Sequence, residues 1–140
     1  MDLTQVPFCK HLGIQQSSRE GGILELSLSP DMVNHLGTFH AGAIFTLAEA
    51  CSGEFLIRHR GEREDIGGVV RRTSGKYSSP GTSDLFGKSD LDPAAVKEAI
   101  ETVDQKGRSL ITIPISIFDQ SETLIGKFTF DWLLASTGSE

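Results

Sequence analysis

One stretch of the sequence restricts the possible folds more than any other. Between Ala41 and Gly53 the clearly polar side chains are limited to Thr46, Glu49 and Ser52. Apolar residues recur there at helical spacing, so the pattern predicts a buried helix over about 41–58. A helix with so little polar surface must be covered by other parts of the chain.

The other elements are mostly strands, and together with the helix they predict the fold class. Strands are expected over 22–29, 66–78, 82–89, 108–118 and 123–134, and short helices over 2–12 and near 92–105. The tetrapeptide DQSE between the last two strands predicts a hairpin. One long helix lying on one antiparallel sheet is an α+β architecture.

Composition narrows the range of partners. The 140 residues are expected to form a single domain over 1–140. The net charge of −6 argues against nucleic acid as a partner, because phosphate binding needs basic side chains. No apolar run approaches the roughly 20 residues that span a bilayer, and the opening residues lack the pattern of a signal peptide. Cys9 and Cys51 are isolated, which is typical of reduced thiols. We therefore expect a cytoplasmic protein with no membrane or metal partner.

Glu49 is the residue that most needs an explanation. Helical projection puts its carboxylate at the edge of the apolar region. One interpretation is a boundary glutamate that reaches solvent. The other is a carboxylate lining a partly dry cleft, where it could activate water or attack an acyl carbon. The pattern alone leaves both open.

The loop before the helix favours the second interpretation. Gly37, His40 and Gly42 surround the expected helix start, where unpaired backbone N–H groups and the positive end of the helix dipole point outward. Such a terminus can stabilise a developing oxyanion. For His40 itself, a ring bonded to the backbone as a loop anchor is favoured over acid–base chemistry.

The motif around this loop resembles a known family. Residues 34–50, NHLGTFHAGAIFTLAEA, resemble the signature N-x-x-G-T-x-H-G-G-x-x-x-x-L-x-[DE] of hotdog-fold acyl-CoA thioesterases of the phenylacetyl-CoA type, which include the acyl-CoA thioesterase 13 group. The segments KYSSPG (76–81), QKGRSL (105–110) and DQSETLIGKF (119–128) are similar to three further segments of that family.

This resemblance implies a fold, an activity and a set of site residues. The implied fold is a curved antiparallel sheet wrapped around the long helix, assembled as a homodimer or homotetramer. The implied catalytic residues are Glu49, Asn34 and the backbone N–H of Ala41. The implied substrate-binding residues are His40, Gly42, Tyr77, Ser78, Ser79, Pro80, Gly81, Lys106, Gly107, Arg108 and Ser109. Coenzyme A enters as part of the substrate, with no separate cofactor.

Three features depart from the family pattern. Ala41 replaces a glycine, which keeps the N–H donor but adds a methyl group to a tight turn. Gly53 and Val70 occupy the two positions where family members carry an additional hydroxyl, and Ser52 or Thr46 is left as a candidate substitute. The helix near 92–105 lengthens the connection between the two segments expected to face coenzyme A.

The spacing of the catalytic residues predicts a shared site. Ala41 and Glu49 lie eight residues apart on one helix, or about 12 Å along its axis at 1.5 Å per residue. One helix can hardly bring both groups to one carbonyl, whereas two antiparallel copies can. We therefore expect a dimer in which the helix start of one chain faces the middle of the helix of the other.

The favoured function is hydrolysis of an acyl-CoA thioester, with Glu49 acting as a general base or as a nucleophile. A non-catalytic hotdog protein that binds acyl-CoA or another lipid ligand is the main alternative. A hotdog dehydratase and a scaffold dimer are further alternatives. The acyl group and the choice between dimer and tetramer are not readable from the pattern.

Overall fold

The structure is a computed structural model, and it describes residues 1–137. Its α-helices are α1 (Pro7–Leu12), α2 (Ala41–His59) and α3 (Ala94–Lys106). Its strands are β1 (Gln15–Gln16), β2 (Leu24–Leu26), β3 (Ile66–Tyr77), β4 (Leu85–Lys88), β5 (Arg108–Phe118) and β6 (Leu124–Ser136). Short 3-10 turns cover Leu3–Gln5 and Pro30–Met32. None of the helices in this part of the chain is long and apolar enough to cross a membrane.

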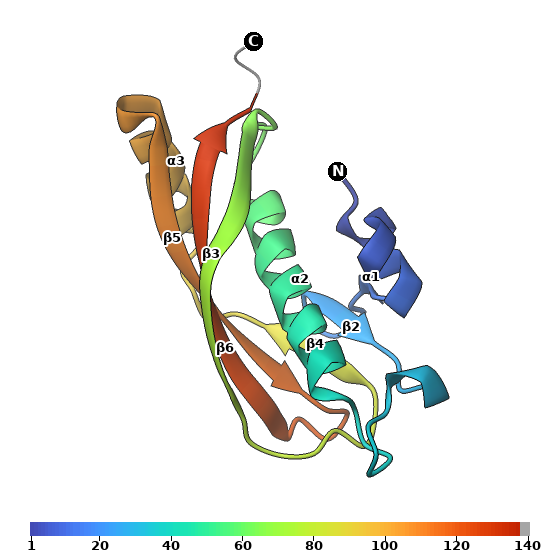
Figure 1. The fold of residues 1–140 in the computed structure, drawn as a ribbon. Helices are drawn as coiled ribbons and strands as arrows, with labels where there is room; N and C mark the ends of the chain where they lie inside the picture. Colours follow the sequence, from blue (N-terminus) through green and yellow to red (C-terminus); the bar gives the residue numbers. More distant parts are fainter. Residues whose placement is uncertain (138–140) are drawn as a thin grey trace.

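The strands form one antiparallel sheet in the order β1-β2-β4-β5-β6-β3. The three long strands, β5, β6 and β3, curve around α2, which lies along the inner face of the sheet (Figure 1). The expected α+β architecture, with one long helix held by an antiparallel sheet, is therefore confirmed. Within the described residues β3 is an edge strand, paired with β6 on one side.

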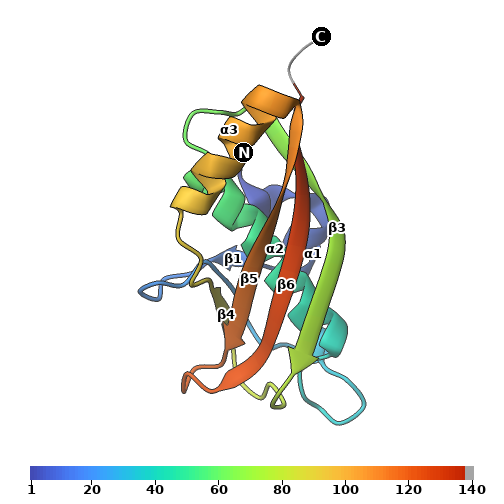
Figure 2. The same ribbon diagram turned by 90° about the vertical axis from the view of Figure 1, so that its left-hand side faces the viewer.

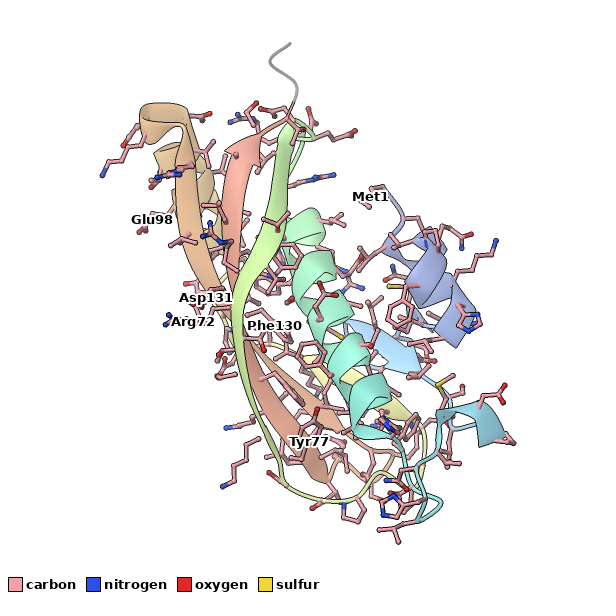
Figure 3. All side chains as sticks on the ribbon, viewed as in Figure 1. Met1, Arg72, Tyr77, Glu98, Phe130 and Asp131 are labelled. Atoms are coloured by element: carbon pink, nitrogen blue, oxygen red, sulfur yellow. The ribbon has the colours of Figure 1, made fainter. Side chains whose placement is uncertain are left out.

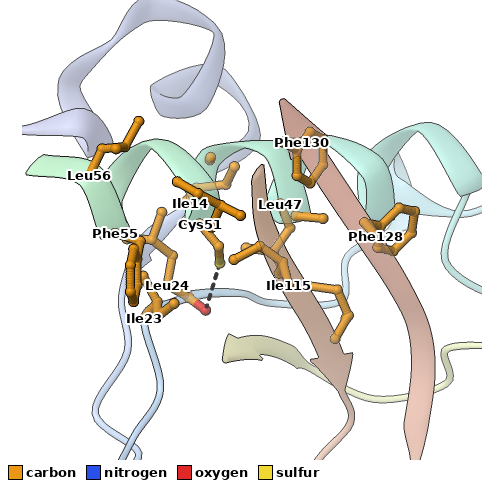
Figure 4. Packing of buried hydrophobic residues seen from close by; sticks show 14 of the residues in the cluster. Ile14, Ile23, Leu24, Leu47, Cys51, Phe55, Leu56, Ile115, Phe128 and Phe130 are labelled. Atoms are coloured by element: carbon orange, nitrogen blue, oxygen red, sulfur yellow. Dashed lines mark hydrogen bonds between the residues drawn. The ribbon is translucent and has the colours of Figure 1, made fainter. Parts of the chain in front are cut away.

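The core lies between α2 and the inner face of the sheet (Figure 4). On β5 the residues that face α2 alternate with exposed or half-buried ones, and the four inward isoleucines are Ile111, Ile113, Ile115 and Ile117. On the helix, Leu47, Ala48 and Cys51 are fully buried. Burial raises the pKa of the Cys51 thiol to about 12, so this thiol is an unreactive part of the core.

The helix α3 occupies a place that the sheet leaves open. The short strand β4 pairs with the Phe118 end of β5, and the last pair joins Lys88 of β4 to Ser116 of β5. The remainder of β5 has no strand on that side, and α3 packs there instead (Figure 2). Gly107, with a φ of 89°, ends α3 in the left-handed conformation and lets the chain turn directly into β5.

Three details of the expected elements are different in the structure. The strand expected over 22–29 is shorter, because the backbone N–H of Leu28 donates to the Asp84 side chain. The helix expected over 2–12 is divided into a 3-10 turn and α1, with Pro7 at the first position of α1. The i, i+4 spacing of Glu54 and Arg58 is typical of an exposed helical pair, whereas in the structure the Glu54 carboxylate lies in the interior.

The burial of the Glu54 carboxylate is caused by tertiary contacts. Glu54 is 6% exposed, and its Oε2 lies 3.0 Å from Arg58 Nε and 3.2 Å from Gln16 Nε2. Arg58 also donates to Gln16 Oε1 at 2.6 Å and to the Ile23 carbonyl oxygen at 2.8 Å. The N-terminal strands therefore cover this helical pair, which a reading of the helix alone treats as solvent-exposed.

Candidate active site

The loop that leads into α2 is organised by the side chain of Asn34. Its Oδ1 accepts hydrogen bonds from the backbone N–H groups of Leu36 (2.9 Å) and Thr38 (3.1 Å), and its Nδ2 donates to Thr38 Oγ1 (3.0 Å). Gly37 has a φ of 80°, which closes the turn. Both ends of the amide are thus occupied within the loop. The family resemblance implies that this amide binds the substrate carbonyl or positions water. Because Nδ2 also lies 3.4 Å from the Phe39 carbonyl oxygen, donation to a substrate carbonyl requires one of these bonds to open.

His40 is the N-cap of α2. Its Nδ1 accepts the backbone N–H of Gly42 at 2.8 Å, which confirms the expected role of the ring as a loop anchor. The N–H of Gly42 is therefore occupied. The N–H of Ala41 has no hydrogen-bond acceptor among residues 1–137, and Ala41 itself is exposed. The first residue of α2 thus presents a free donor at the positive end of the helix dipole.

The segment Tyr77–Gly81, which the family resemblance assigns to coenzyme A binding, lies beside this helix start. Tyr77 donates its hydroxyl to the carbonyl oxygen of Ala41 at 3.1 Å (Figure 3). The backbone N–H groups of Ser78 and Ser79 both donate to the Ile125 carbonyl oxygen, at 2.8 and 3.3 Å. After Pro80, the carbonyl oxygen of Gly81 accepts the backbone N–H of Phe39 at 2.9 Å.

Glu49 is half-buried, two turns further along α2. Its carboxylate forms no hydrogen bond or ion pair with any residue in 1–137. Burial raises the pKa of Glu49 above its ordinary value of 4.5. The pKa of the neighbouring Cys9 thiol is also raised, first by its own burial and then by the Glu49 charge. An unpaired carboxylate in a partly dry position is the environment that the second interpretation of Glu49 required.

The two candidate substitutes for the family hydroxyl are both engaged. Ser52 is fully buried and donates to the Glu49 carbonyl oxygen at 2.7 Å, while it accepts the indole N–H of Trp132 at 2.9 Å. Thr46 donates to the Gly42 carbonyl oxygen at 2.8 Å. In this arrangement neither hydroxyl is free to act on a substrate bound near Glu49.

The second predicted coenzyme-facing segment, Lys106–Ser109, lies at the other end of the sheet. Arg108 pairs with Ala135 of β6, which in turn pairs with Gly67 of β3. Tyr77 is ten residues further along β3, or roughly 33 Å at 3.3 Å per residue. One chain therefore does not bring the two segments together.

Within that segment the four residues have different surroundings. Lys106, Gly107 and Arg108 are exposed. Ser109 is buried, and its hydroxyl donates to the Ala99 carbonyl oxygen at 2.8 Å. The side chain of Ser109 therefore fastens α3 to β5 and is not available to a ligand in this structure.

An apolar cavity of about 310 Å³ beside the C-terminal half of α2 was not foreseen from the sequence. It lies between α2, β3, β6, α3 and the N-terminal turn at Leu3, and Gly53, Trp132 and Ile100 are among its lining residues. The available signal was the set of glycines in apolar elements, Gly53 on the helix and Gly67 and Gly68 on the strand. No group of three or more potential metal-ligating side chains is found among residues 1–137.

A family model matches residues 4–134, and its description is "Domain of unknown function (DUF4442)". The chain belongs to the DUF4442 family. Among curated proteins, none matches this sequence.

Solved structures share the fold of this DUF4442 member at low sequence identity. PA5026 from Pseudomonas aeruginosa, described as a probable thioesterase, is 18% identical with a TM-score of 0.81, over 96% of this chain and 91% of that one. PaaI from E. coli is 16% identical with a TM-score of 0.63, over 96% and 86%. BH2602 from Bacillus halodurans, solved with CoA, is 15% identical with a TM-score of 0.66, over 91% and 74%. The fold is the hotdog fold that the sequence predicted.

Proposed function

We propose that the protein hydrolyses an acyl-CoA thioester to a free acid and coenzyme A, in a site formed by two copies of the chain. The observation that carries the proposal is that α2 has two unused groups among the described residues: the Ala41 N–H at its start and the half-buried Glu49 carboxylate. The description of PA5026 as a probable thioesterase and the CoA in the BH2602 structure support this class of substrate.

The distance between Ala41 and Glu49 requires a second copy of the chain. The eight residues between Ala41 and Glu49 correspond to about 12 Å along the helix, too far for both to act on one carbonyl. The less buried residues of the first half of α2 form one stripe, which consists of Ala41, Gly42, Phe45, Thr46 and Glu49. An antiparallel second helix facing this stripe brings the Ala41 of one chain to the Glu49 of the other.

The edge strand β3 offers a surface for this assembly. It is twelve residues long, and its side chains from Arg71 to Tyr77 are exposed. Long unpaired edges tend to pair with another strand. Antiparallel pairing of β3 with its copy sets the Tyr77 end of one strand beside the Ile66 end of the other. The Lys106–Arg108 segment of one chain then approaches the helix start of its partner, where the phosphates of coenzyme A need positive charge.

In the proposed reaction the thioester carbonyl oxygen accepts the Ala41 N–H, and the helix dipole stabilises the negative charge that develops there. Glu49 of the second copy takes a proton from water as the water oxygen attacks the carbonyl carbon. The carbon–sulfur bond then breaks, and Glu49 gives the proton that it took from water to the coenzyme A thiolate, which restores the carboxylate. A raised pKa brings the Glu49 carboxylate closer to the operating pH, which suits a general base. Asn34 acts as a positioning residue that holds the loop before Ala41.

Direct attack by Glu49, through a mixed anhydride, is the second route for the same reaction. A single turnover in heavy-oxygen water gives a positive test for the anhydride route. General-base catalysis puts the label into the released acid and leaves Glu49 unlabelled, whereas the anhydride route, when water attacks the Glu49 carbonyl, labels the carboxylate.

The proposal is tested with a panel of acyl-CoA thioesters and detection of the released thiol. Glu49→Gln keeps the size of the side chain and removes its charge, so it should abolish turnover while the fold is retained. Glu54→Gln is a matched control, because Glu54 lies on the same helix and is bonded to Arg58. Near-normal turnover by Glu49→Gln would remove this residue from the mechanism.

A non-catalytic protein that binds acyl-CoA or another lipid ligand is the second candidate. The engaged hydroxyls of Ser52 and Thr46, together with Gly53 and Val70 at the family's hydroxyl positions, favour it. Binding of a slowly hydrolysed thioester by the wild-type protein, with no thiol released from any member of the panel, would support this function in place of hydrolysis.

A further inference from the structure

The apolar cavity begins one helical turn beyond Glu49. Gly53 forms part of its wall, and a Cβ built on Gly53 would lie 3.5 Å from the Trp132 ring. The missing side chain leaves space between α2 and β6 on the side of the helix that continues from Glu49, about 6 Å along the axis. Trp132 is fixed across this space by its hydrogen bond to Ser52.

The lining of the cavity is almost entirely apolar. Leu56, Ile100 and Leu134 contribute aliphatic side chains to it. Among residues 1–137, Arg60 is the one lining residue with a charged side chain, and it donates to the Ile66 carbonyl oxygen at 2.9 Å. A hydroxyl placed against these aliphatic side chains would lose its water without gaining a partner. A hydrocarbon group instead restores the van der Waals contacts that the walls of an empty cavity lack.

The floor of the cavity is formed by α3. Val96 is fully buried and Ile100 is 6% exposed, and both line the cavity from this helix. Two attachments fix α3 in place: Ser109 donates to the Ala99 carbonyl oxygen, and the Arg63 guanidinium holds both Asp104 oxygens at 2.8 Å. The depth of the cavity is therefore set by a firmly held element.

From these observations we infer that this cavity receives the hydrocarbon part of the acyl group and that α3, through Ile100, sets the length it accepts. The inference rests on the proposed function and specifies its substrate class: thioesters of unsubstituted acyl groups of moderate size. The cavity volume of about 310 Å³ lies at the lower end of the ~300–1,000 Å³ typical of small-molecule sites. Hydroxylated acyl groups are disfavoured by the apolar lining.

The test varies the floor of the cavity. Ile100→Phe reduces its depth and Ile100→Val increases it slightly, while Glu98→Gln is the control, because Glu98 is exposed on the same helix (Figure 3). Hydrolysis of a series from acetyl-CoA to palmitoyl-CoA is measured for each variant, and thermal unfolding checks the fold. For Ile100→Phe, kcat/KM should fall at least about tenfold for decanoyl-CoA and stay within about twofold of wild type for acetyl-CoA. Glu98→Gln should retain the wild-type profile.

A binding measurement separates this inference from the proposed function. Titration calorimetry with free decanoate should detect binding to wild type and a loss of at least about tenfold in affinity for Ile100→Phe. If no thioester is hydrolysed but decanoate binds in this way, the cavity assignment stands and the hydrolase proposal fails. If Glu49→Gln abolishes turnover while folded Ile100→Phe keeps the wild-type chain-length profile and decanoate affinity, the hydrolase proposal stands and the cavity assignment fails.

A second position covers the case in which Ile100→Phe does not fold. Gly53→Ala adds a methyl group at ordinary contact distance from Trp132 and narrows the wall nearest Glu49. It should lower kcat/KM more for decanoyl-CoA than for acetyl-CoA, and an equal effect on both would contradict the inference. A hydroxyacyl-CoA hydrolysed as fast as its unsubstituted counterpart would overturn the substrate class.

Discussion

Tyr77 donates its hydroxyl to the carbonyl oxygen of Ala41, 3.1 Å away, so the last residue of β3 is tied to the first residue of α2. Ala41, whose carbonyl oxygen accepts this bond, also carries the free N–H that is assigned to the substrate carbonyl. The phenol ring is itself held by Phe128, with ring centroids 5.3 Å apart in an edge-to-face arrangement. The geometry of the helix start therefore depends on the edge strand as well as on its own loop.

Tyr77→Phe should lower activity without lowering stability much. The variant loses one hydrogen bond, worth about 0.5–1.5 kcal/mol, while its ring can keep the contact with Phe128. If this bond positions Ala41, kcat/KM should fall by about three- to tenfold, with the melting temperature changed little because the residue is half-exposed. Steady-state kinetics and thermal unfolding measure the two effects. Unchanged kinetics would show that the helix start is held by its own loop alone.

The pH dependence of both rate and stability should report on Glu49. The proposed chemistry needs the ionised carboxylate, so kcat should rise with pH through a midpoint above the ordinary value of 4.5, because burial raises the pKa of Glu49. The folded protein also holds this proton more tightly than the unfolded chain. The corresponding stability is present at low pH and is lost as pH rises through the raised pKa.

Glu49→Gln provides the comparison for this prediction. Its amide has no charge to bury, so at neutral pH the variant should be as stable as wild type or more stable, and the difference should disappear toward low pH. Melting temperatures across the pH range, together with the wild-type pH–rate profile, make the measurement. A rate midpoint at or below 4.5, or a variant less stable than wild type at neutral pH, would contradict the assigned environment of Glu49.

The parts of the fold that were predicted correctly are those with local signals. The strand expected over 108–118 is β5 with the same ends, because its alternating isoleucines specify a face and Gly107 specifies the start. The helix expected over 41–58 ends one residue later, at His59. The anchoring role of His40 also came from local chemistry, since an N-cap side chain bonds within its own turn.

The features that the sequence did not reveal all depend on contacts between different elements of the fold. The carboxylate of Glu54 is buried because Gln16 folds over it, 38 residues away. The Ser109 hydroxyl turns inward because α3 supplies the Ala99 carbonyl. Glycines from a helix and a strand line the same cavity, and no periodicity within either element reports that they do so.

Arg58→Ala should destabilise the protein considerably. It leaves the buried Glu54 carboxylate without its cationic partner, a change that costs about 3–5 kcal/mol when both groups are buried. Because the Arg58 side chain is 36% exposed, solvent screening reduces this, and we expect a loss of about 2 kcal/mol. Urea unfolding measures it. Adding Glu54→Gln to this variant should restore part of the loss by removing the unpaired charge, and a double variant weaker than Arg58→Ala would contradict the explanation.

Val69→Lys should weaken the proposed dimer and its activity together. Val69 lies on the edge strand β3 and is 59% exposed. Lysines on an edge oppose strand pairing, and a twofold interface brings two copies of the new charge near each other. Association should weaken by at least about tenfold, which corresponds to 1.4 kcal/mol, and specific activity should fall with dilution. Light scattering and activity over a range of protein concentrations measure both.

Leu110→Lys is the matched control, because Leu110 is 65% exposed on β5, two strands from that edge, and its variant should remain dimeric. A Val69→Lys monomer with full activity per chain would show that one helix supplies the whole site.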